Sequence, residues 1–547
     1  MDLASPTGLT AEPSAPGARS LRDGRRGRSL DALYAAAIVT IVATGVVVRS
    51  RGVLAFPFWL DECSWATFLM EKPLAELVIR PIGFMGLSKA MAVVFGPSVG
   101  ALRCVPWVAG IATTVLSPFL ARRLFSARAA RLLFVAAIAF NSEAINYAKE
   151  FKPYSLGLFL HCAVLFLTLN YLHTSKTRDL LVALAVAVAA VLFTQDIVFA
   201  YPGALLAVLI FASRRRRWPE IAAIVVAGAT ALSLITLQYV FIWSKLEQGE
   251  SRIWGHKYDV FFTGRDAGGA WLGWAFHKYL DLAAFPGITR LEWHASWLTA
   301  KSLATLVSLS AFVWVTLHVL GVVAIVSRKH VSLALLLLLP LLVMVILNRA
   351  GFWPFGAFRT NLFTLPYTSA IAGAAFDWAP TAASDRAHPR VRWLPFLPAF
   401  ALVIFPSLLL YDGWQRIAHN PPHALVMPEI VENLVQMQGE AVPPEPQLLV
   451  LDAYSCDPWN YYTKYNPSVV NTWGAKLQGR FSAVCAETDR ASVDALRGVA
   501  PGEHAWSLFV GTYTRQFPGF HRMLNRRFQI EKRANVGAAV TVEFTTQ

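Results

Sequence analysis

Long apolar runs separated by short polar segments fill the first three quarters of the chain. About 11 of them approach or exceed the roughly 20 residues that an α-helix needs to cross a bilayer. They lie at 31–49, 99–121, 130–147, 155–173, 180–196, 197–213, 219–243, 299–326, 331–347, 361–378 and 393–411. The pattern predicts a polytopic α-helical membrane protein with about 11 transmembrane helices.

Basic residues gather in short clusters between these runs. The clusters are Arg25 with Arg26 and Arg28, Arg122 with Arg123, 214–217, Arg328 with Lys329, and Arg390 with Arg392. Alternating the direction of successive helices puts every cluster on one side, and such clusters mark cytoplasmic loops. We therefore expect a multi-pass protein of the plasma (cell inner) membrane, with a cytoplasmic N-terminus and an extracytoplasmic C-terminus.

The composition agrees with a protein embedded in a lipid bilayer. Of the 547 residues, 55% are hydrophobic and only 15% are charged, which is too apolar for a soluble chain of this length. The net charge of +15 is typical of some nucleic-acid-binding proteins. Because the basic residues lie in loops between apolar runs, we expect no nucleic-acid partner.

The two ends of the chain differ from its middle. Residues 1–29 are rich in Pro, Gly, Ser and Arg, which predicts a disordered cytoplasmic arm. Residues 30–411 form the predicted transmembrane domain, and 412–547 a small extracytoplasmic α/β domain. A segment near 486–497 is expected to be helical, and three runs in this last part have the character of strands: 447–452, 506–510 and 538–544.

Two other features of the C-terminal part bear on function. It contains no glycine-rich phosphate loop, so we expect no nucleotide cofactor. Cys456 and Cys485 both fall in it, and whether they pair stays open at this point, because sequence alone does not fix a disulfide.

An acidic pair, Asp61 and Glu62, follows directly after the first apolar run. Aromatic residues crowd the same stretch, including Trp59 and Trp65. Two carboxylates beside tryptophans at a membrane surface indicate a site that handles protons or polar ligands. The alternative is a helix N-terminus, where acidic side chains simply complement the helix dipole.

A second polar cluster lies at the outer end of the third apolar run. It contains Lys149, Glu150, Lys152 and Tyr154, with Pro153 predicted to form a tight turn between two helices. Two lysines at a membrane surface can neutralise a phosphate group. The alternative is that these lysines snorkel to the interface and form one local ion pair.

Two arginines complete the set of candidate site residues. Arg359 begins the tenth apolar run from the outer side, where positive charge is disfavoured, and its alternative role is a surface anchor. Arg80 is a weaker candidate. It interrupts the apolar segment 74–95, for which we expect an interfacial or re-entrant helix.

The order of these pieces resembles that of the GT-C superfamily of integral-membrane glycosyltransferases. The likeness is to the branch with protein mannosyltransferases and the bacterial aminoarabinose transferase. In that branch an Asp-Glu pair follows the first span, and Glu-x-Arg-Pro-Tyr comes later. The matching residues here are Asp61 with Glu62, Arg80 with Pro81, 95–103, Glu150 with Lys152, Pro153 and Tyr154, 359–363, and 459–462. Arg80 stands where the branch has histidine, and Lys152 stands where arginine is common.

The resemblance implies sugar transfer from a polyprenyl-phosphate donor to a glycan, lipid or protein acceptor on the outer face of the membrane. Asp61 is then the general base, with Glu62 as its orienting neighbour or an acceptor contact. Lys149, Lys152 and Arg359 stabilise the leaving lipid phosphate, and Tyr154 donates a hydrogen bond to phosphate or sugar. No metal-ligand set stands out, so we expect metal-independent chemistry without a cofactor.

Two other functions stay open on the sequence. A transporter or flippase of lipid-linked saccharides would use the same outer-face lysines, but it predicts charged residues near mid-membrane and repeated span patterns. A glycan polymer ligase would also act on lipid-linked glycans. The sequence leaves the sugar, the acceptor and the anomeric outcome open.

Overall fold

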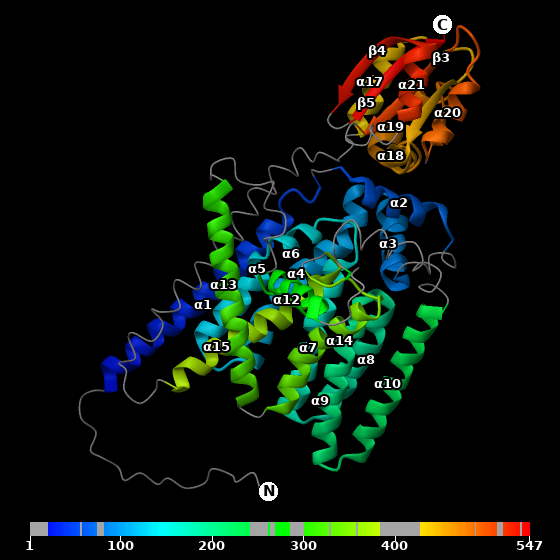
Figure 1. Cartoon of the computed structure of the whole chain (residues 1–547). Helices are drawn as coiled ribbons and strands as arrows, with labels where there is room; N and C mark the ends of the chain where they lie inside the picture. The colour runs from blue at the N-terminus through cyan, green and yellow to red at the C-terminus, as the bar shows by residue number, and fades with distance from the viewer. Residues whose placement is uncertain are drawn as a thin grey trace, which may run out of the picture.

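A bundle of long helices and a strand-containing C-terminal part make up the protein (Figure 1). The computed structural model describes residues 20–54, 57–73, 81–240, 261–262, 269–284, 300–327, 330–356, 359–382, 427–486, 488–510, 518–536 and 539–546. The bundle contains α1 (Ser20–Ser50), α4 (Val99–Leu124), α7 (Tyr154–Thr174), α8 (Thr177–Phe193), α9 (Ala200–Arg214), α10 (Trp218–Gln238), α13 (Ala300–Ser327), α14 (Val331–Arg349) and α15 (Leu365–Ala382).

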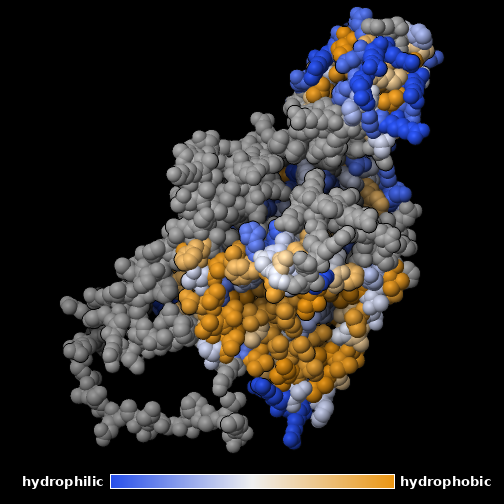
Figure 2. All heavy atoms as spheres, viewed as in Figure 1, coloured by the Kyte–Doolittle hydropathy of each residue, from blue (hydrophilic) through white to orange (hydrophobic). Residues whose placement is uncertain are grey.

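Six helical segments within the described residues are long and apolar enough to cross a membrane. They are Asp31–Ser50, Val99–Leu124, Tyr154–Thr174, Asp196–Arg214, Trp218–Gln238 and Val331–Arg349. All six coincide with predicted apolar runs. The surface of the bundle is broadly hydrophobic, whereas the C-terminal part is mostly hydrophilic (Figure 2). Such an apolar surface is stable only when lipid covers it.

Several predicted spans have a different form in the structure. The run 130–147 is divided between α5 (Arg128–Phe140) and α6 (Ser142–Tyr147), so it is not one continuous helix. The run 393–411 lies outside the described residues. The predicted total of about 11 spans therefore stays a prediction. At the N-terminus, α1 begins at Ser20, so the last third of the predicted disordered arm 1–29 is helical, and 1–19 lie outside the described residues.

A fully buried arginine explains why the break between α5 and α6 is stable. The guanidinium group of Arg49 donates to the carbonyl oxygens of Ile138 (2.8 Å) and Ala139 (2.6 Å) at the end of α5. The last carbonyls of a helix have no partner within it, and burial without one is costly. The side chain of Asn141 accepts from the backbone N–H of Ala144 and so caps α6.

The predicted interfacial helix is α3 (Ile82–Phe95), although residues 74–80 lie outside the described part of the chain. The ammonium group of Lys89 in α3 donates to the carbonyl oxygen of Leu69 (2.6 Å), near the end of α2 (Leu60–Glu71). Val93, Val94 and Phe95 at its other end are exposed. An apolar end exposed in this way suits a helix that dips into lipid.

The C-terminal part contains a five-stranded sheet of order β2-β1-β3-β5-β4. Its strands are β1 (Gln447–Asp452), β2 (Phe481–Ala486), β3 (His504–Val510), β4 (Phe528–Val536) and β5 (Ala539–Thr546). Strand β1 pairs in parallel with β2 and β3, whereas β5 pairs antiparallel with β3 and β4. Its helices are α17 (Met427–Gln438), α18 (Ala453–Lys464), α19 (Pro467–Leu477), α20 (Asp489–Arg497) and α21 (Pro518–Arg527).

The sequence indicated the three inner strands but not the two edge strands. Leu449, Val450 and Leu451 of β1 are fully buried, which gives the continuous apolar run typical of a covered parallel strand. Both β2 and β4 lie at sheet edges, and the central residues of β2 are exposed. An edge strand has no apolar pattern imposed by burial, so it leaves little trace in the sequence.

Helix α18 joins the sheet to the bundle. A disulfide between Cys456 of α18 and Cys485 of β2 ties this helix to the sheet and settles the pairing that sequence left open. On the other side α18 packs against α2, and the hydroxyl of Tyr461 donates to the carbonyl oxygen of Pro97 (2.8 Å). Helix α18 therefore links the sheet to α2, the helix that carries the acidic pair.

Candidate active site

Asp61 lies between two cationic side chains that come from distant parts of the chain. It occupies the first turn of α2, and its Oδ2 atom accepts a hydrogen bond from Arg359 (2.7 Å). The same oxygen lies 3.8 Å from the ammonium nitrogen of Lys152. The Asp61 side chain is 30% exposed, so a ligand can reach it. Three of the predicted site residues therefore meet at one accessible point.

Lys152 is held in place by an aromatic ring. Its side chain is only 4% exposed, and its nitrogen lies 4.5 Å from the centre of the Trp65 ring in α2. A cation over the face of a tryptophan is stabilised by the ring's quadrupole. Pro153 follows immediately as the N-cap residue of α7, and its ring restricts the direction of the chain after the lysine. Lys152 is thus a buried cation that lies within 4 Å of the Asp61 carboxylate.

Arg359 begins the short 3₁₀ helix η5 (Arg359–Thr364). The amide nitrogen of Asn361 donates to the carbonyl oxygens of Pro354 and Gly356, and the indole of Trp353 donates to the Asn361 side-chain oxygen. These bonds fix the turn before η5. Gly356 has φ of +104°, a conformation that other residues rarely adopt.

The environment of Arg359 favours the charged form of its guanidinium group. Burial alone would lower its pKa, but the neighbouring Tyr154, Asp61 and Tyr147 oppose this effect and leave the pKa raised. A guanidinium group that stays charged at every physiological pH is suited to neutralise an anion.

Glu62 points away from the exposed side of α2 and is fully buried. Its two oxygens accept from the Nε (2.8 Å) and Nη2 (2.6 Å) atoms of Arg103, and the backbone N–H of Phe151 donates to it as well (2.6 Å). This set joins α4, α2 and the turn before Lys152. Glu62 is thus buried and bound to Arg103 and Phe151, and its expected role as the orienting neighbour of Asp61 or as an acceptor contact stays a prediction.

The other predicted residues are placed as follows. Lys149 is buried, and Glu150 and Tyr154 are half-buried, all within the turn between α6 and α7 or at its end. The Tyr154 ring packs edge-on against Tyr147, with centres 5.1 Å apart. Arg80 lies outside the described residues. No group of three or more potential metal ligands occurs among the residues that the structure describes.

Sequence reasoning missed the contribution of α18. The Tyr462 hydroxyl accepts a hydrogen bond from the backbone N–H of Phe58 (2.7 Å), three residues before Asp61, although 404 positions separate the two. The Phe58 ring in turn packs against Tyr461 and under the guanidinium group of Arg103. No local pattern predicts a contact across this separation. A buried tyrosine's need for a polar partner was the one available signal.

Comparison with known proteins shows what the chain is similar to. Residues 80–243 match the family model described as dolichyl-phosphate-mannose-protein mannosyltransferase, and this segment contains the turn with Lys149 and Lys152. No curated protein matches the chain in sequence. The solved structures that share its fold include two of ArnT from Cupriavidus metallidurans.

The likeness to ArnT extends over nearly the whole chain. The apo structure has a TM-score of 0.53 at 12% identity, covering 92% of this chain and 97% of that chain. The structure bound to undecaprenyl phosphate has a TM-score of 0.51 at 14% identity, with the same coverage. At such low identity the structural match shows the fold alone. Together with the family match, it confirms the resemblance to the GT-C integral-membrane glycosyltransferases.

A first prediction concerns the buried pair. Replacing Glu62 with Gln leaves the Arg103 charge buried without its counter-ion, and we expect this to lower the free energy of unfolding by about 3–5 kcal/mol. Thermal or denaturant unfolding of the purified, detergent-solubilised protein measures the effect.

The matched control is Glu71→Gln at the other end of α2. Glu71 lies 3.8 Å from Lys464 in a pair that is 40% and 54% exposed, and such a pair contributes at most about 1 kcal/mol. Equal losses in the two variants would show that Glu62 does not hold this part of the fold together.

Proposed function

We propose that the chain transfers a sugar from a polyprenyl-phosphate donor to an acceptor hydroxyl on the outer face of the membrane, with Asp61 as general base. The observation that carries the proposal is the meeting of Asp61 with Lys152 and Arg359 at an accessible point of an integral-membrane fold. A carboxylate can accept the proton of the attacking hydroxyl, and two cations can stabilise a phosphate leaving group.

The donor class is supported by two of the comparisons. The matched family model is described by its dolichyl-phosphate-linked mannose donor, and one ArnT structure holds undecaprenyl phosphate. Both compounds are polyprenyl phosphates. The proposal extends to this class of donor and to no particular hexose or pentose.

The charges around Asp61 support phosphate binding at this position. The described contacts bring two cations, Lys152 and Arg359, to one oxygen of the Asp61 carboxylate. A lipid phosphate entering from the bilayer is attracted to such a site. We propose that its oxygens replace the Asp61 carboxylate as the partners of Lys152 and Arg359.

This exchange of partners also prepares the base. A carboxylate bound by two cations is a poorer proton acceptor than one released from them. Once the phosphate holds the cations, Asp61 faces the acceptor. The acceptor oxygen then attacks the anomeric carbon while the bond from that carbon to the phosphate oxygen breaks. The acceptor proton goes to Asp61, and the negative charge stays on the lipid phosphate beside Lys152 and Arg359.

A second prediction tests this assignment. Asp61→Asn keeps the size of the side chain but removes the base, so we expect transfer of radiolabelled sugar from a polyprenyl-phosphate donor to fall about 10²- to 10⁴-fold. Purified protein in detergent or nanodiscs, with acceptor-containing membrane extract, provides the assay. Glu71→Gln, at the far end of the same helix, is expected to retain transfer.

Three outcomes would contradict the proposal. Full transfer by Asp61→Asn would show that another group takes the proton. Movement of the intact lipid-linked saccharide across vesicles by the wild-type protein, without transfer, would instead indicate a transporter or flippase. Transfer of a preassembled glycan chain rather than a single sugar would indicate a polymer ligase.

A third prediction concerns Lys149. Burial, together with repulsion from Arg49, Arg51 and Arg103, lowers the pKa of Lys149 to about 7. The ammonium form exists below this value and is lost as the pH rises through it. If Lys149 contacts the donor phosphate, affinity for undecaprenyl phosphate falls as the pH rises from 6 to 8, by roughly the several-fold effect of one charge.

The control for this prediction is Lys149→Arg, whose guanidinium group stays charged over the same range. The comparison uses the slopes of the two pH profiles, because arginine also changes the geometry of the contact. Parallel profiles for the two proteins would remove Lys149 from the phosphate site.

A further inference from the structure

A second group of ionisable side chains lies buried within the helical bundle. His161 of α7 is fully buried, and its Nδ1 atom lies 2.9 Å from the hydroxyl oxygen of Tyr367 in α15. Its Nε2 atom lies 3.5 Å from the carboxylate of Asp196, which begins the 3₁₀ helix η2 (Asp196–Phe199). The hydroxyl of Thr194 donates to the same Asp196 oxygen (2.5 Å). The chemistry proposed above uses none of these groups.

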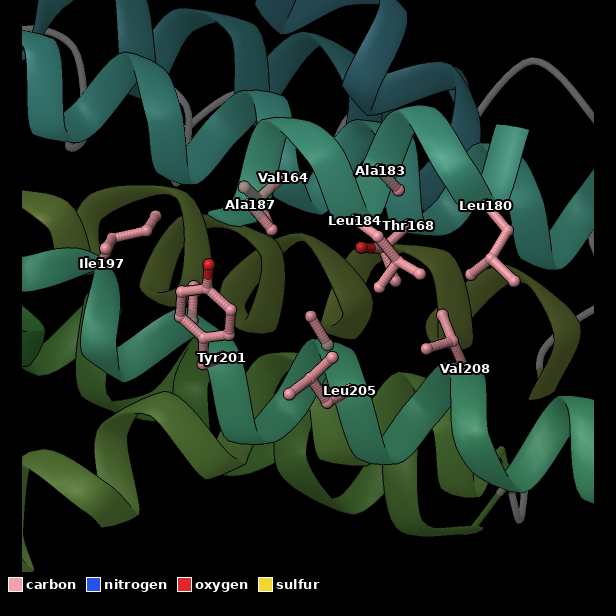
Figure 3. Close-up of a pocket in the computed structure, with 12 residues that line it drawn as sticks. Val164, Thr168, Leu180, Ala183, Leu184, Ala187, Ile197, Tyr201, Leu205 and Val208 are labelled. Carbon is pink, nitrogen blue, oxygen red and sulfur yellow. The ribbon is translucent and has the colours of Figure 1, made fainter. Parts of the chain in front are cut away.

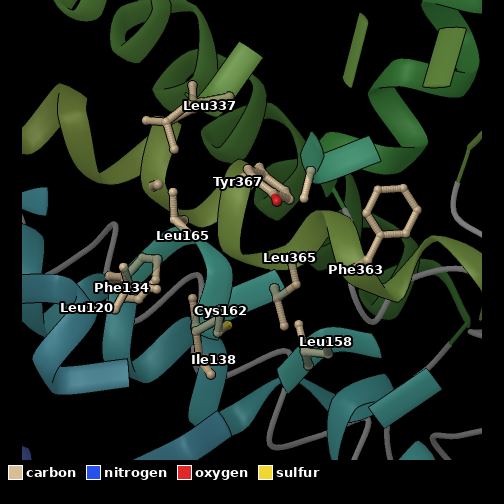
Figure 4. Packing of buried hydrophobic residues seen from close by; sticks show 14 of the residues in the cluster. Leu120, Phe134, Ile138, Leu158, Cys162, Leu165, Leu337, Phe363, Leu365 and Tyr367 are labelled. Carbon is tan, nitrogen blue, oxygen red and sulfur yellow. The ribbon is translucent and has the colours of Figure 1, made fainter. Parts of the chain in front are cut away.

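The Asp196 carboxylate is packed closely against α7. A side chain on Gly157 of α7 would place its Cβ atom 2.5 Å from Oδ2 of Asp196, so the glycine allows the carboxylate to approach the helix. Tyr367 and Phe363 belong to the same cluster of buried residues as Leu158, Cys162 and Leu165 of α7 (Figure 4). Ionisable groups inside a membrane protein are costly and are usually retained for a function.

The ring of His161 also stacks on Phe363. The two ring centres are 4.8 Å apart, and the other face of Phe363 stacks on Phe199 of η2 with centres 4.7 Å apart and planes 3° from parallel. Phe363 belongs to η5, the same short helix that begins with Arg359. Phe363 of η5 thus stacks on a histidine whose Nδ1 atom has a hydrogen-bond partner and whose Nε2 atom lies 3.5 Å from the Asp196 carboxylate.

We propose that His161 and Asp196 are positioning residues that set the place of Arg359 through Phe363. A neutral imidazole accepts at one nitrogen and donates at the other. The Tyr367 hydroxyl donates to Nδ1, and the proton on Nε2 then faces the Asp196 carboxylate. These two contacts fix the plane of the ring, the ring fixes Phe363, and η5 carries the effect to the guanidinium group that contacts Asp61. The inference rests on the proposed role of Arg359 in binding the donor phosphate.

The test is a titration of the purified full-length chain with undecaprenyl phosphate, which has no sugar and therefore measures binding alone. His161→Phe keeps an aromatic ring for stacking but removes both polar contacts. Asp196→Asn removes the negative charge that faces Nε2, and Tyr367→Phe removes the hydroxyl at Nδ1. We expect each to weaken binding of undecaprenyl phosphate by about three- to tenfold, the size of one lost contact between coupled residues.

A cycle with Arg359→Gln separates positioning from general damage to the fold. If His161 acts through Arg359, His161→Phe weakens binding in the wild-type chain but causes no further loss in the Arg359→Gln chain. Lys152→Gln, which removes the other cation, is expected to weaken binding about equally in the presence and absence of His161→Phe. Thermal unfolding of every variant accompanies the titration.

The control variant is Tyr201→Phe in α9. Its hydroxyl lines a small apolar cavity between α7, α8 and α9, together with Thr168 and Leu205 (Figure 3). This hydroxyl is buried and forms no hydrogen bond among the described residues. Its loss removes a buried hydroxyl without breaking a described hydrogen bond, and we expect unchanged binding.

The outcomes separate this inference from the proposed function. Binding that Arg359→Gln weakens but the variants at His161, Asp196 and Tyr367 leave unchanged would overturn the positioning role and leave the donor site standing. Equal losses from His161→Phe in both Arg359 backgrounds would also overturn it. Absence of undecaprenyl phosphate binding in the wild type would overturn the donor class and the inference together.

Discussion

The contact of one carboxylate with two cations is the constraint on which the rest of the site depends. Asp61, Lys152 and Arg359 belong to segments that are far apart in the chain, and each is held by its own support. Like charges at such short range are unfavourable unless a counter-ion lies between them, so Asp61 keeps the two cations together until another anion replaces it. Under the proposed function, this contact prepares the site for a phosphate before any ligand arrives.

Three kinds of support hold these residues in place, and all are buried. The pair of Glu62 and Arg103 fixes the start of α2 against α4. Helix α18 fixes the segment before Asp61 from the side of the sheet, through the hydroxyl of Tyr462. Hydrogen bonds of Asn361 fix the turn that leads to Arg359. Rigid supports of this kind let a site act without reorganising its charges during the reaction.

Much of this arrangement could be predicted because it follows from membrane topology. Hydropathy gave most of the long helices, and charge bias put Asp61, Lys152 and Arg359 on one side, which made their meeting plausible. The ion-pair partners of individual side chains could not be predicted, because the pairing of Glu62 with Arg103 depends on packing between helices. The contact of Tyr462 could not be predicted for the same reason. The edge strands could not be predicted because they lack an apolar pattern.

The most direct test of the central claim is a cryo-electron microscopy structure of the chain with undecaprenyl phosphate. The account predicts the phosphate within hydrogen-bond distance of both Lys152 and Arg359, and the Asp61 carboxylate released from at least one of them toward the exposed side. A phosphate bound elsewhere, with the contact between Asp61 and Arg359 unchanged, would contradict it.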